Sequence, residues 1–145
     1  MGFKKALEIS VSGLMAEKKR LELISSNIAN INTTRTLDGG AYRRKIAVFQ
    51  ENPLSFSEEL AIAENNNVIG GGGVEVAEVV SDQSPYQKVY KPGHPDADSN
   101  GYVNMPNVDL STEMVDMVAA GKFYDANITV YEATKKNIMN IIQLQ

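Results

Sequence analysis

The residues best suited to chemistry lie in one acidic turn, Asp96-Ala97-Asp98-Ser99-Asn100-Gly101. Their spacing matches the opening of an EF-hand loop, in which alternate oxygen ligands surround calcium at a glycine turn. The twelfth residue of such a loop is a bidentate glutamate, and here that position is Asn107. The prolines and glycine between Pro92 and Pro95 also exclude the incoming helix, so we favour an Asx-rich turn that leads into a strand. The candidate calcium ligands are Asp96, Asp98 and Asn100.

The single histidine, His94, has no partners of the kind that histidine chemistry needs. With no cysteine and no second histidine, it cannot anchor a typical zinc site or a cysteine-based triad. The absence of cysteine also excludes disulfides. We therefore interpret His94 as a turn residue.

Two other features could bind phosphate, but neither has the required context. Gly70–Gly73 are four consecutive glycines, yet no Gly-Lys-Ser/Thr sequence follows and no G-x-G-x-x-G unit joins a strand to a helix. Arg43, Arg44 and Lys45 are adjacent cations, which we interpret as the solvated end of an edge strand. The net charge of −4 argues against nucleic-acid binding. No pair of carboxylates predicts a catalytic pocket, so we expect neither an enzyme nor a cofactor.

The elements that dominate the sequence are two long amphipathic segments, one at each end. In the first, large apolar residues recur every seven positions, with further apolar residues three or four positions away. This pattern predicts a helix over residues 3–31 that packs along another helix. Its seam contains Leu7, Val11, Leu14, Leu21, Ile24 and Ile28, and its polar end contains Asn27 and Asn30.

The second segment, residues 110–142, has the same sevenfold repeat. Its seam contains Leu110, Met114, Met117, Tyr124, Ile128, Tyr131 and Ile138. Asp109 or Ser111 can cap the start of this helix. A row of alanines on roughly the opposite side permits close approach of another helix, although alanine is also a good general helix former. This row consists of Ala119, Ala126 and Ala133. Because both segments share length and period, we expect an antiparallel or crossing pair.

The middle of the chain is predicted to be a small β-rich region. Ser55 and Glu58 can form a capping box for a short helix, and the asparagines and glycines at about 51–73 predict a mobile loop. The strands expected around it, over residues 42–50, 74–80, 86–90 and 101–105, suffice for a small sheet or two hairpins. The sequence therefore predicts an α+β fold, with two long terminal helices packed as a coiled-coil-like pair. Its expected parts are an N-terminal helix over 1–33, the β-rich region over 34–108 and a C-terminal helix over 109–145.

No segment has the pattern of a cleaved export leader or a membrane span. Lys4 and Lys5 are followed by Glu8 and further charges before any apolar stretch of adequate length. No apolar run approaches the roughly 18 residues of a spanning helix. We therefore expect no direct membrane insertion, and any export to proceed without cleavage of a signal peptide.

The apolar residues of the two helices exceed what one helix pair can bury. Each buried leucine or isoleucine contributes about 1.5–3 kcal/mol, but a single pair covers only one face of each helix. Residues on the back of the first helix, such as Ile9 and Leu23, would remain in water in a monomer. Many copies packed side by side would bury them.

Four segments, in this order, resemble the flagellar rod, hook and hook-associated protein family. The third is the most specific of the four, and together they span both ends and most of the second half of the chain. The middle region is too short for the extra domain of distal-rod and hook relatives, which favours a proximal-rod member. One departure is Gly121-Lys122-Phe123, where relatives usually have a Ser-Arg pair before the tyrosine. The segments are Ser10–Leu21 with Ser26–Thr33, Tyr42–Lys45 with Val48-Phe49, Tyr90–Val115, and Tyr124–Ile128 with Thr134-Lys135.

The resemblance implies a structural subunit of the bacterial flagellar basal body, exported by the flagellar type III apparatus without leader cleavage. It also implies that the terminal helices line the inner tube of a helical rod that crosses the periplasm. The implied partners are other rod subunits and the basal-body adaptor and ring, in homo- and hetero-oligomeric contacts. The residues expected to pack in this assembly are the two seams together with Asn27, Asn30 and Asn127.

Two other classes of function stay open as alternatives. The first is a small calcium-binding regulatory domain that uses the Asp96–Gly101 turn. The second is an enzyme that uses the Gly70–Gly73 loop, which would require nucleotide binding, and we expect none.

Overall fold

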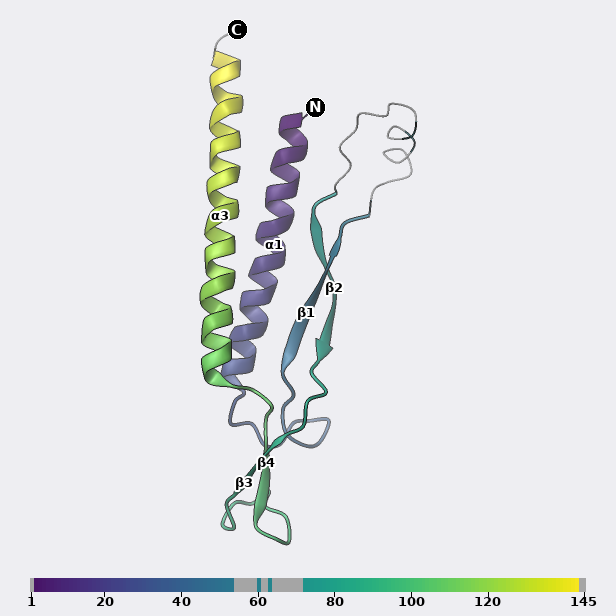
Figure 1. Ribbon diagram of the computed structural model, residues 1–145, viewed down its shortest axis with the longest axis vertical. Helices are drawn as coiled ribbons and strands as arrows, with labels where there is room; N and C mark the ends of the chain where they lie inside the picture. Colours follow the sequence, from purple (N-terminus) through teal and green to yellow (C-terminus); the bar gives the residue numbers. More distant parts are fainter. Residues whose placement is uncertain (1, 54–59, 61–62, 64–71, 144–145) are drawn as a thin grey trace. The chain divides into compact units, whose positions relative to one another are not determined.

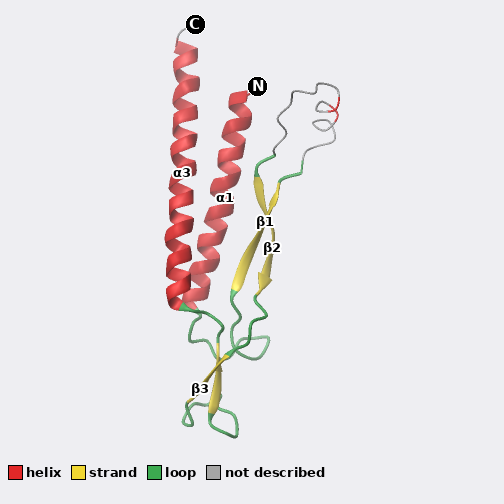
Figure 2. Cartoon of the chain, in the orientation of Figure 1, coloured by secondary structure: helices red, strands yellow, loops and turns green. Residues whose placement is uncertain are grey.

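The computed structural model describes residues 2–53, 60, 63 and 72–143 (Figure 1). The described residues form two long helices, one towards each end of the chain, with short strands between them (Figure 2). This arrangement confirms the predicted α+β class. The elements are α1 (Gly2–Ala29), β1 (Lys45–Glu51), β2 (Val74–Ser81), β3 (Gln87–Tyr90), β4 (Tyr102–Met105) and α3 (Leu110–Gln143).

The chain divides into two compact units, and both helices contribute to each. Unit 1 contains Met1–Lys19, Val48–Glu78 and Gly121–Gln145. Unit 2 contains Arg20–Ala47 and Val79–Ala120. Each unit has its own contact between α1 and α3.

The strands form two small sheets, β1 with β2 and β3 with β4. In the antiparallel β3–β4 pair, Val89 lies opposite Val103 and Tyr90 opposite Tyr102. Because successive side chains of a strand point to opposite faces, Val103 is buried while the two tyrosines stay exposed. The tyrosine rings pack edge to face, with their centroids 5.3 Å apart. The hairpin therefore buries a valine face in unit 2 and leaves an aromatic face in water.

The buried residues are concentrated in unit 2. Among the described residues of unit 1, only Ser10 and Ala16 are buried, and the Ser10 hydroxyl donates to the Ala6 carbonyl at 2.9 Å. Unit 2 buries large apolar side chains from α1, from the segment before β1 and from the region around β4. Its buried apolar residues are Leu23, Ile24, Ala41, Tyr42, Val103, Val108 and Ala120. The expectation that Leu23 would remain in water in a monomer is therefore wrong, whereas Ile9 is 42% exposed.

The helix ends follow from local hydrogen bonds. The helix predicted to reach residue 31 ends at Ala29, after which the side-chain Nδ2 of Asn30 donates to the Ser26 carbonyl at 2.9 Å. At the start of α3, Asp109 Oδ1 accepts from the Thr112 N–H at 2.8 Å and from its hydroxyl at 2.9 Å. These bonds lower the pKa of Asp109 below its ordinary value. Asp109 is therefore the N-cap that the sequence allowed.

The predicted strands are found with shifted bounds. The first begins at Lys45 and not at Tyr42, whereas β2, β3 and β4 lie close to their expected positions. The short helix predicted around Ser55 and Glu58 lies outside the described residues, as does most of the predicted loop over 51–73. Within the described residues, no helix is long and apolar enough to cross a membrane.

The predicted seam residues do not share one environment. Ile24 is buried, whereas Leu110 is 46% exposed and Met114 is 56% exposed. The start of the α3 seam therefore stays outside the core of the subunit. The half-buried seam residues are Leu7, Val11, Leu14, Leu21, Ile28, Met117, Tyr124, Ile128, Tyr131 and Ile138.

Candidate functional site

A buried polar cluster joins the end of α1 to the start of α3 within unit 2. Asn27, 1% exposed, donates from Nδ2 to the Lys45 carbonyl at 3.0 Å and to Glu113 Oε2 at 3.1 Å. Its Oδ1 accepts from the Tyr42 hydroxyl at 3.0 Å and from the Lys45 N–H at 2.9 Å. Every hydrogen-bonding position of this buried amide is thus filled. The cluster, which we call the polar node, consists of Asn27, Tyr42, Arg44, Glu113 and Asp116.

The charge of Glu113 is neutralised inside the polar node. Glu113 is 0% exposed, and its Oε1 accepts a hydrogen bond from Arg44 Nε. Arg44 Nη2 also donates to Asp116 Oδ2 at 2.9 Å. Arg20 forms a second ion pair with Asp116, with Nη2 of Arg20 3.5 Å from Oδ1 of Asp116. Burial acts to lower the pKa of Arg44, but the hydrogen bond and charge of Glu113 and the charge of Asp116 outweigh it and raise this pKa. The node therefore holds a satisfied, charge-paired carboxylate.

The backbone on both sides fixes Arg44 in the polar node. Its N–H donates to Asn107 Oδ1 at 2.8 Å, and its carbonyl accepts from the Asp82 N–H at 2.8 Å. Asn107 Nδ2 in turn donates to the Asp82 carbonyl at 3.1 Å. The interpretation of the three cations as a solvated strand end is therefore wrong for Arg44, which lies before β1 and forms ion pairs with α3.

Arg43 makes a separate contact on the surface of unit 2. Its guanidinium lies 4.4 Å from the centroid of the Tyr86 ring, a cation–π distance. Its Nη1 donates to the Asp82 carbonyl at 3.2 Å, and the Tyr86 hydroxyl donates to the Ala41 carbonyl at 3.0 Å. These contacts attach the segment after β2 to the segment before β1.

In unit 1, adjacent small residues of α1 contact α3 on one side and β2 on the other. A Cβ atom on Gly13 would lie 2.9–3.1 Å from three side-chain atoms of Asn127, which is closer than ordinary contact. The Ser12 hydroxyl accepts from the Val74 N–H at 3.1 Å. Gly73, with a φ of +90°, would place a Cβ atom 2.3 Å from Ser12 Oγ. The positive φ of Gly73 therefore favours glycine there, and Gly13 allows the flexible Asn127 side chain to approach α1 closely.

An open, mostly apolar groove of about 430 Å³ lies in unit 1. Its polar lining side chains are Glu17 and Asn127. The apolar residues that line the groove include Ile9, Phe49, Val74 and Phe123.

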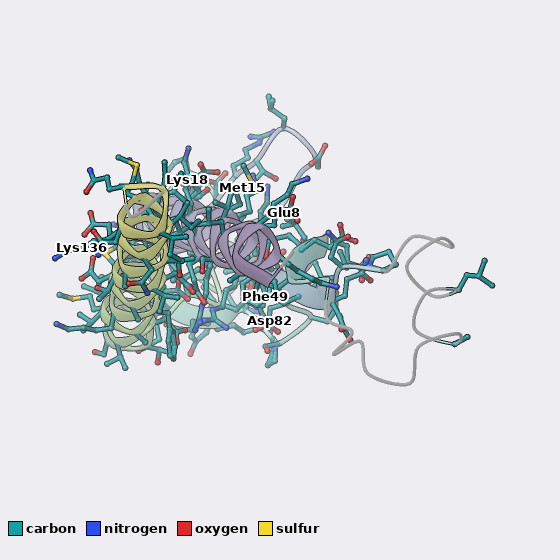
Figure 3. The ribbon with its side chains drawn as sticks, turned by 90° about the horizontal axis from the view of Figure 1, so that it is seen from above. Glu8, Met15, Lys18, Phe49, Asp82 and Lys136 are labelled. Carbon is teal, nitrogen blue, oxygen red and sulfur yellow. The ribbon has the colours of Figure 1, made fainter. Side chains whose placement is uncertain are left out.

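Figure 3 shows Lys136 on the side of α3 away from α1, while Met15 and Lys18 extend from α1.

The acidic turn has the geometry of an Asx turn, as the sequence predicts. Asp98 Oδ1 accepts from the Asn100 N–H at 2.8 Å and from the Tyr102 N–H at 2.9 Å. Gly101 has a φ of +81°, and Asp96 Oδ2 accepts from the Thr34 hydroxyl at 2.8 Å. Among the residues that the structure describes, no group of three or more carboxylate or histidine side chains is arranged to hold a metal ion.

His94 lies in the preceding turn, where its N–H donates to the Lys91 carbonyl at 3.0 Å. Its Nδ1 accepts from the Asp96 N–H at 3.1 Å. The interpretation of His94 as a turn residue is confirmed.

The sequence predicts a packing role for Asn27, but it does not predict the hydrogen bonds and ion pairs that join Asn27, Tyr42, Arg44 and Glu113 within one chain. Asn107, which lies in the third segment of family resemblance and at the twelfth position of the candidate calcium loop, accepts a hydrogen bond from the backbone of Arg44. The available signal was a polar residue, Glu113, one turn into an amphipathic helix, on the face that packs inward.

α3 carries large apolar side chains that the subunit leaves exposed. In its first part, which lies in unit 2, the exposed fractions are 56% for Met114, 69% for Val115 and 64% for Val118. In its later part, which lies in unit 1, they are 55% for Phe123 and 53% for Val130. Several of these residues lie off the face that packs on α1, so α3 has additional apolar rows available for contacts with other chains.

The family comparisons match both helices and the segment before α3. A family model described as "Flagella basal body rod protein" matches residues 7–35. Another, described as "Flagellar basal body rod FlgEFG protein C-terminal", matches residues 99–144. The two helices that meet in the polar node are therefore those of a flagellar rod protein.

Curated relatives narrow this class. The chain is 41% identical over 142 residues to the flagellar basal-body rod protein FlgC of Borreliella burgdorferi, covering 93% of this chain and 92% of that protein. It is 38% identical to FlgC of Bacillus subtilis, covering 96% and 95%, and 38% identical to FlgC of Salmonella typhimurium, covering 99% and 98%. The chain belongs to the FlgC family of flagellar basal-body rod proteins.

The family fixes the general role of the protein. It is a structural subunit of the rod in the bacterial flagellar basal body, and it assembles with other basal-body components. None of the comparisons supports a calcium-binding regulatory domain.

Proposed function

We propose that the protein is a non-enzymatic subunit of the proximal rod, whose terminal helices pack with those of neighbouring subunits into the inner tube of a torque-transmitting shaft. The observation that carries this proposal is the set of apolar side chains on α3 that stay 46–69% exposed in the subunit, namely Leu110, Met114, Val115 and Val118. A helix with an apolar row on more than one side needs a partner on more than one side.

The energetics favour assembly through these rows. Full burial of one such side chain contributes about 1.5–3 kcal/mol, and roughly half of each remains to be buried. Four residues therefore offer about 3–6 kcal/mol per subunit from this row alone, before the entropy cost of association. This contribution is modest for a pair of subunits and becomes large when each subunit has many neighbours.

The mechanical role follows from the two kinds of contact. Interdigitated side chains between helices resist sliding because their packing density matches that of a protein core. The polar node fixes α1 to α3 inside each subunit, so that a shear load on one helix is carried by the other. We propose that the rod transmits torque in this way, without chemistry and without a cofactor.

The proposed partners are other rod subunits, and at the proximal end the basal-body adaptor and ring. We also propose export by the flagellar type III apparatus without removal of a leader, and a rod that crosses the periplasm. Family membership supports these partners and this export route. The net charge of −4 argues against nucleic acid as a further partner. The subunit needs no direct membrane insertion in this role.

The test compares two exposed valines in cells that lack the native gene. Val118→Asp places a charge in the α3 row, and Val79→Asp makes the same change on β2, where Val79 is 42% exposed. We expect Val118→Asp to prevent rod assembly and swimming while the isolated subunit keeps its helix content by circular dichroism. Val79→Asp should swim. Equal swimming of both variants, with basal bodies visible by electron microscopy, would contradict the role of this row.

A further inference from the structure

The apolar seams of α1 and α3 do not determine how the two helices are aligned along their length. The seam of α1 repeats every seven residues, at Leu7, Leu14 and Leu21, and that of α3 does the same at Tyr124 and Tyr131. If one helix slides by seven residues, apolar side chains again face apolar side chains. Such a slide moves the helices by about 10 Å and leaves the seam intact.

A different heptad row contains unlike residues. On α1 it consists of Gly13, Arg20 and Asn27, and on α3 of Glu113, Ala120 and Asn127. In unit 1, Gly13 meets Asn127, because a Cβ atom there would lie 2.9 Å from Asn127 Nδ2. In unit 2, Asn27 meets Glu113 through a hydrogen bond of 3.1 Å.

These two contacts are spaced alike on both helices. They lie fourteen residues apart on α1, from Gly13 to Asn27, and fourteen apart on α3, from Glu113 to Asn127. Between the α3 positions, Ala120 is 0% exposed. The row therefore pairs a small residue with a larger one at Gly13 and Asn127, and two polar residues at Asn27 and Glu113. These two pairs lie two heptads apart.

We propose that this row sets the antiparallel register of α1 on α3. A slide of seven residues in one direction would place Asn27 opposite Ala120, and the same slide would place Arg20 opposite Asn127. Asn27 would then lose its acceptor on Glu113, and the buried Glu113 would lose its neighbours in the polar node. Burial of such polar groups without partners is strongly unfavourable.

The opposite slide would place Arg20 opposite Glu113, which pairs opposite charges, but it breaks the native contacts of Gly13 and Asn27. It would place Gly13 opposite Ala120, which leaves a void where Asn127 now lies over Gly13. Asn27 would move beyond the first residue of α3 and would again lack the carboxylate acceptor. In coiled coils, a single polar residue at the interface can fix the register of the helices at some cost in stability. Here two contacts of one row, Gly13 with Asn127 and Asn27 with Glu113, have this role.

The consequence for assembly rests on the proposed function. In a rod built from many helices with the same sevenfold repeat, α1 could pair with its own α3 in several registers or with a neighbour's helix. The row Gly13–Asn127 and Asn27–Glu113 gives the intrachain pair one alignment, so that the exposed apolar rows of α3 are presented to neighbours in a defined position.

The test measures the alignment directly in the isolated full chain, so its outcome does not depend on the rod function. The chain has no cysteine, so Lys18→Cys and Lys136→Cys allow two spin labels at exposed positions of α1 and α3 (Figure 3). Pulsed dipolar spectroscopy should give one narrow distance for the otherwise native chain. Asn127→Leu, which replaces the polar residue of this row with an apolar one, should add a second population displaced by up to about 10 Å, with helix content retained.

A residue swap provides the matched control. Gly13→Asn alone places two asparagines at one close approach and should broaden the distance distribution. Gly13→Asn combined with Asn127→Gly moves one glycine from α1 to α3, keeps the overall helix propensity and should restore the single distance. A native distance in both Asn127→Leu and Gly13→Asn would overturn the proposal. If Asn127→Leu loses helix content, the swap decides, and a swap as broad as Gly13→Asn overturns it.

Discussion

Replacement of Arg44 by methionine should strongly destabilise unit 2. Arg44 supplies the positive charge beside Glu113, which is 0% exposed. Removal of one partner from a buried ion pair typically costs about 3–5 kcal/mol, because the other charge stays buried without compensation. Since domains of this size are stable by only about 5–15 kcal/mol, Arg44→Met should lose a large share of the free energy of unfolding.

The effect of a second substitution, Glu113→Gln, should change sign with the background in which it is made. When Glu113→Gln is added to Arg44→Met, the buried charge disappears, and only imperfectly bonded amides remain, at about 1–3 kcal/mol. The double variant should therefore be more stable than Arg44→Met alone, whereas Glu113→Gln in the native background should be destabilising. This reversal of sign is expected only if the charge of Glu113 is the source of the penalty.

The measurement is urea unfolding of the isolated full chain, followed by circular dichroism, for the two single variants and the double variant. Arg43→Met is the matched control, because it removes the same side chain from the neighbouring residue, whose cation–π contact with Tyr86 is worth about 0.5–1 kcal/mol when exposed. If Arg44→Met costs no more than Arg43→Met, or if adding Glu113→Gln lowers stability further, the buried-charge account of the node is wrong.

Other perturbations test the remaining contacts. Tyr42→Phe removes one of the two donors to Asn27 Oδ1 and should cost about 0.5–1.5 kcal/mol in urea unfolding, and a neutral effect would contradict the observed bond. The pKa of Asp109 is lowered in the fold, so its cap stabilises α3 above about pH 4 and is lost as the pH falls through the lowered pKa. Asparagine also caps helices but does not titrate in this range. The difference in free energy of unfolding between Asp109→Asn and the native chain should therefore change below about pH 4. A difference that stays constant with pH would argue against the cap. Leu14→Asp or Ile128→Asp should abolish swimming by blocking rod assembly while hydrogen exchange in β3 and β4 stays native, and normal motility would contradict helix packing in the rod.

The helices and most strands could be predicted because their signals are local. Sevenfold apolar repeats define α1 and α3, and the β-branched run from Val74 defines β2. The cap at Asp109 and the Asx turn at Asp98 were predictable for the same reason, since their hydrogen bonds join residues within four positions.

The polar node could not be predicted because its contacts are long-range. Glu113 meets Asn27 and Arg44 across 86 and 69 positions of sequence, and neither pairing follows from local pattern. A buried glutamate also contradicts the general preference of carboxylates for the surface, so Glu113 was assigned no role in packing. The start of β1 was misplaced for the same reason, because the pairing of Arg44 with α3 competes with the strand.

The unequal burial of the two units leads to a last prediction about the chain before assembly. Unit 2 holds the polar node and a set of large buried side chains, whereas the described residues of unit 1 bury only Ser10 and Ala16. Local opening is easiest where few apolar contacts hold an element, so the parts of α1 and α3 in unit 1 should exchange their amide hydrogens faster than those in unit 2. Assembly supplies neighbours for the exposed rows of α3, so this difference should shrink in isolated basal bodies. Equal protection of residues 4–19 and 121–143 in the free subunit and in the rod would show that the helix ends are already ordered, and that neighbours add little to them.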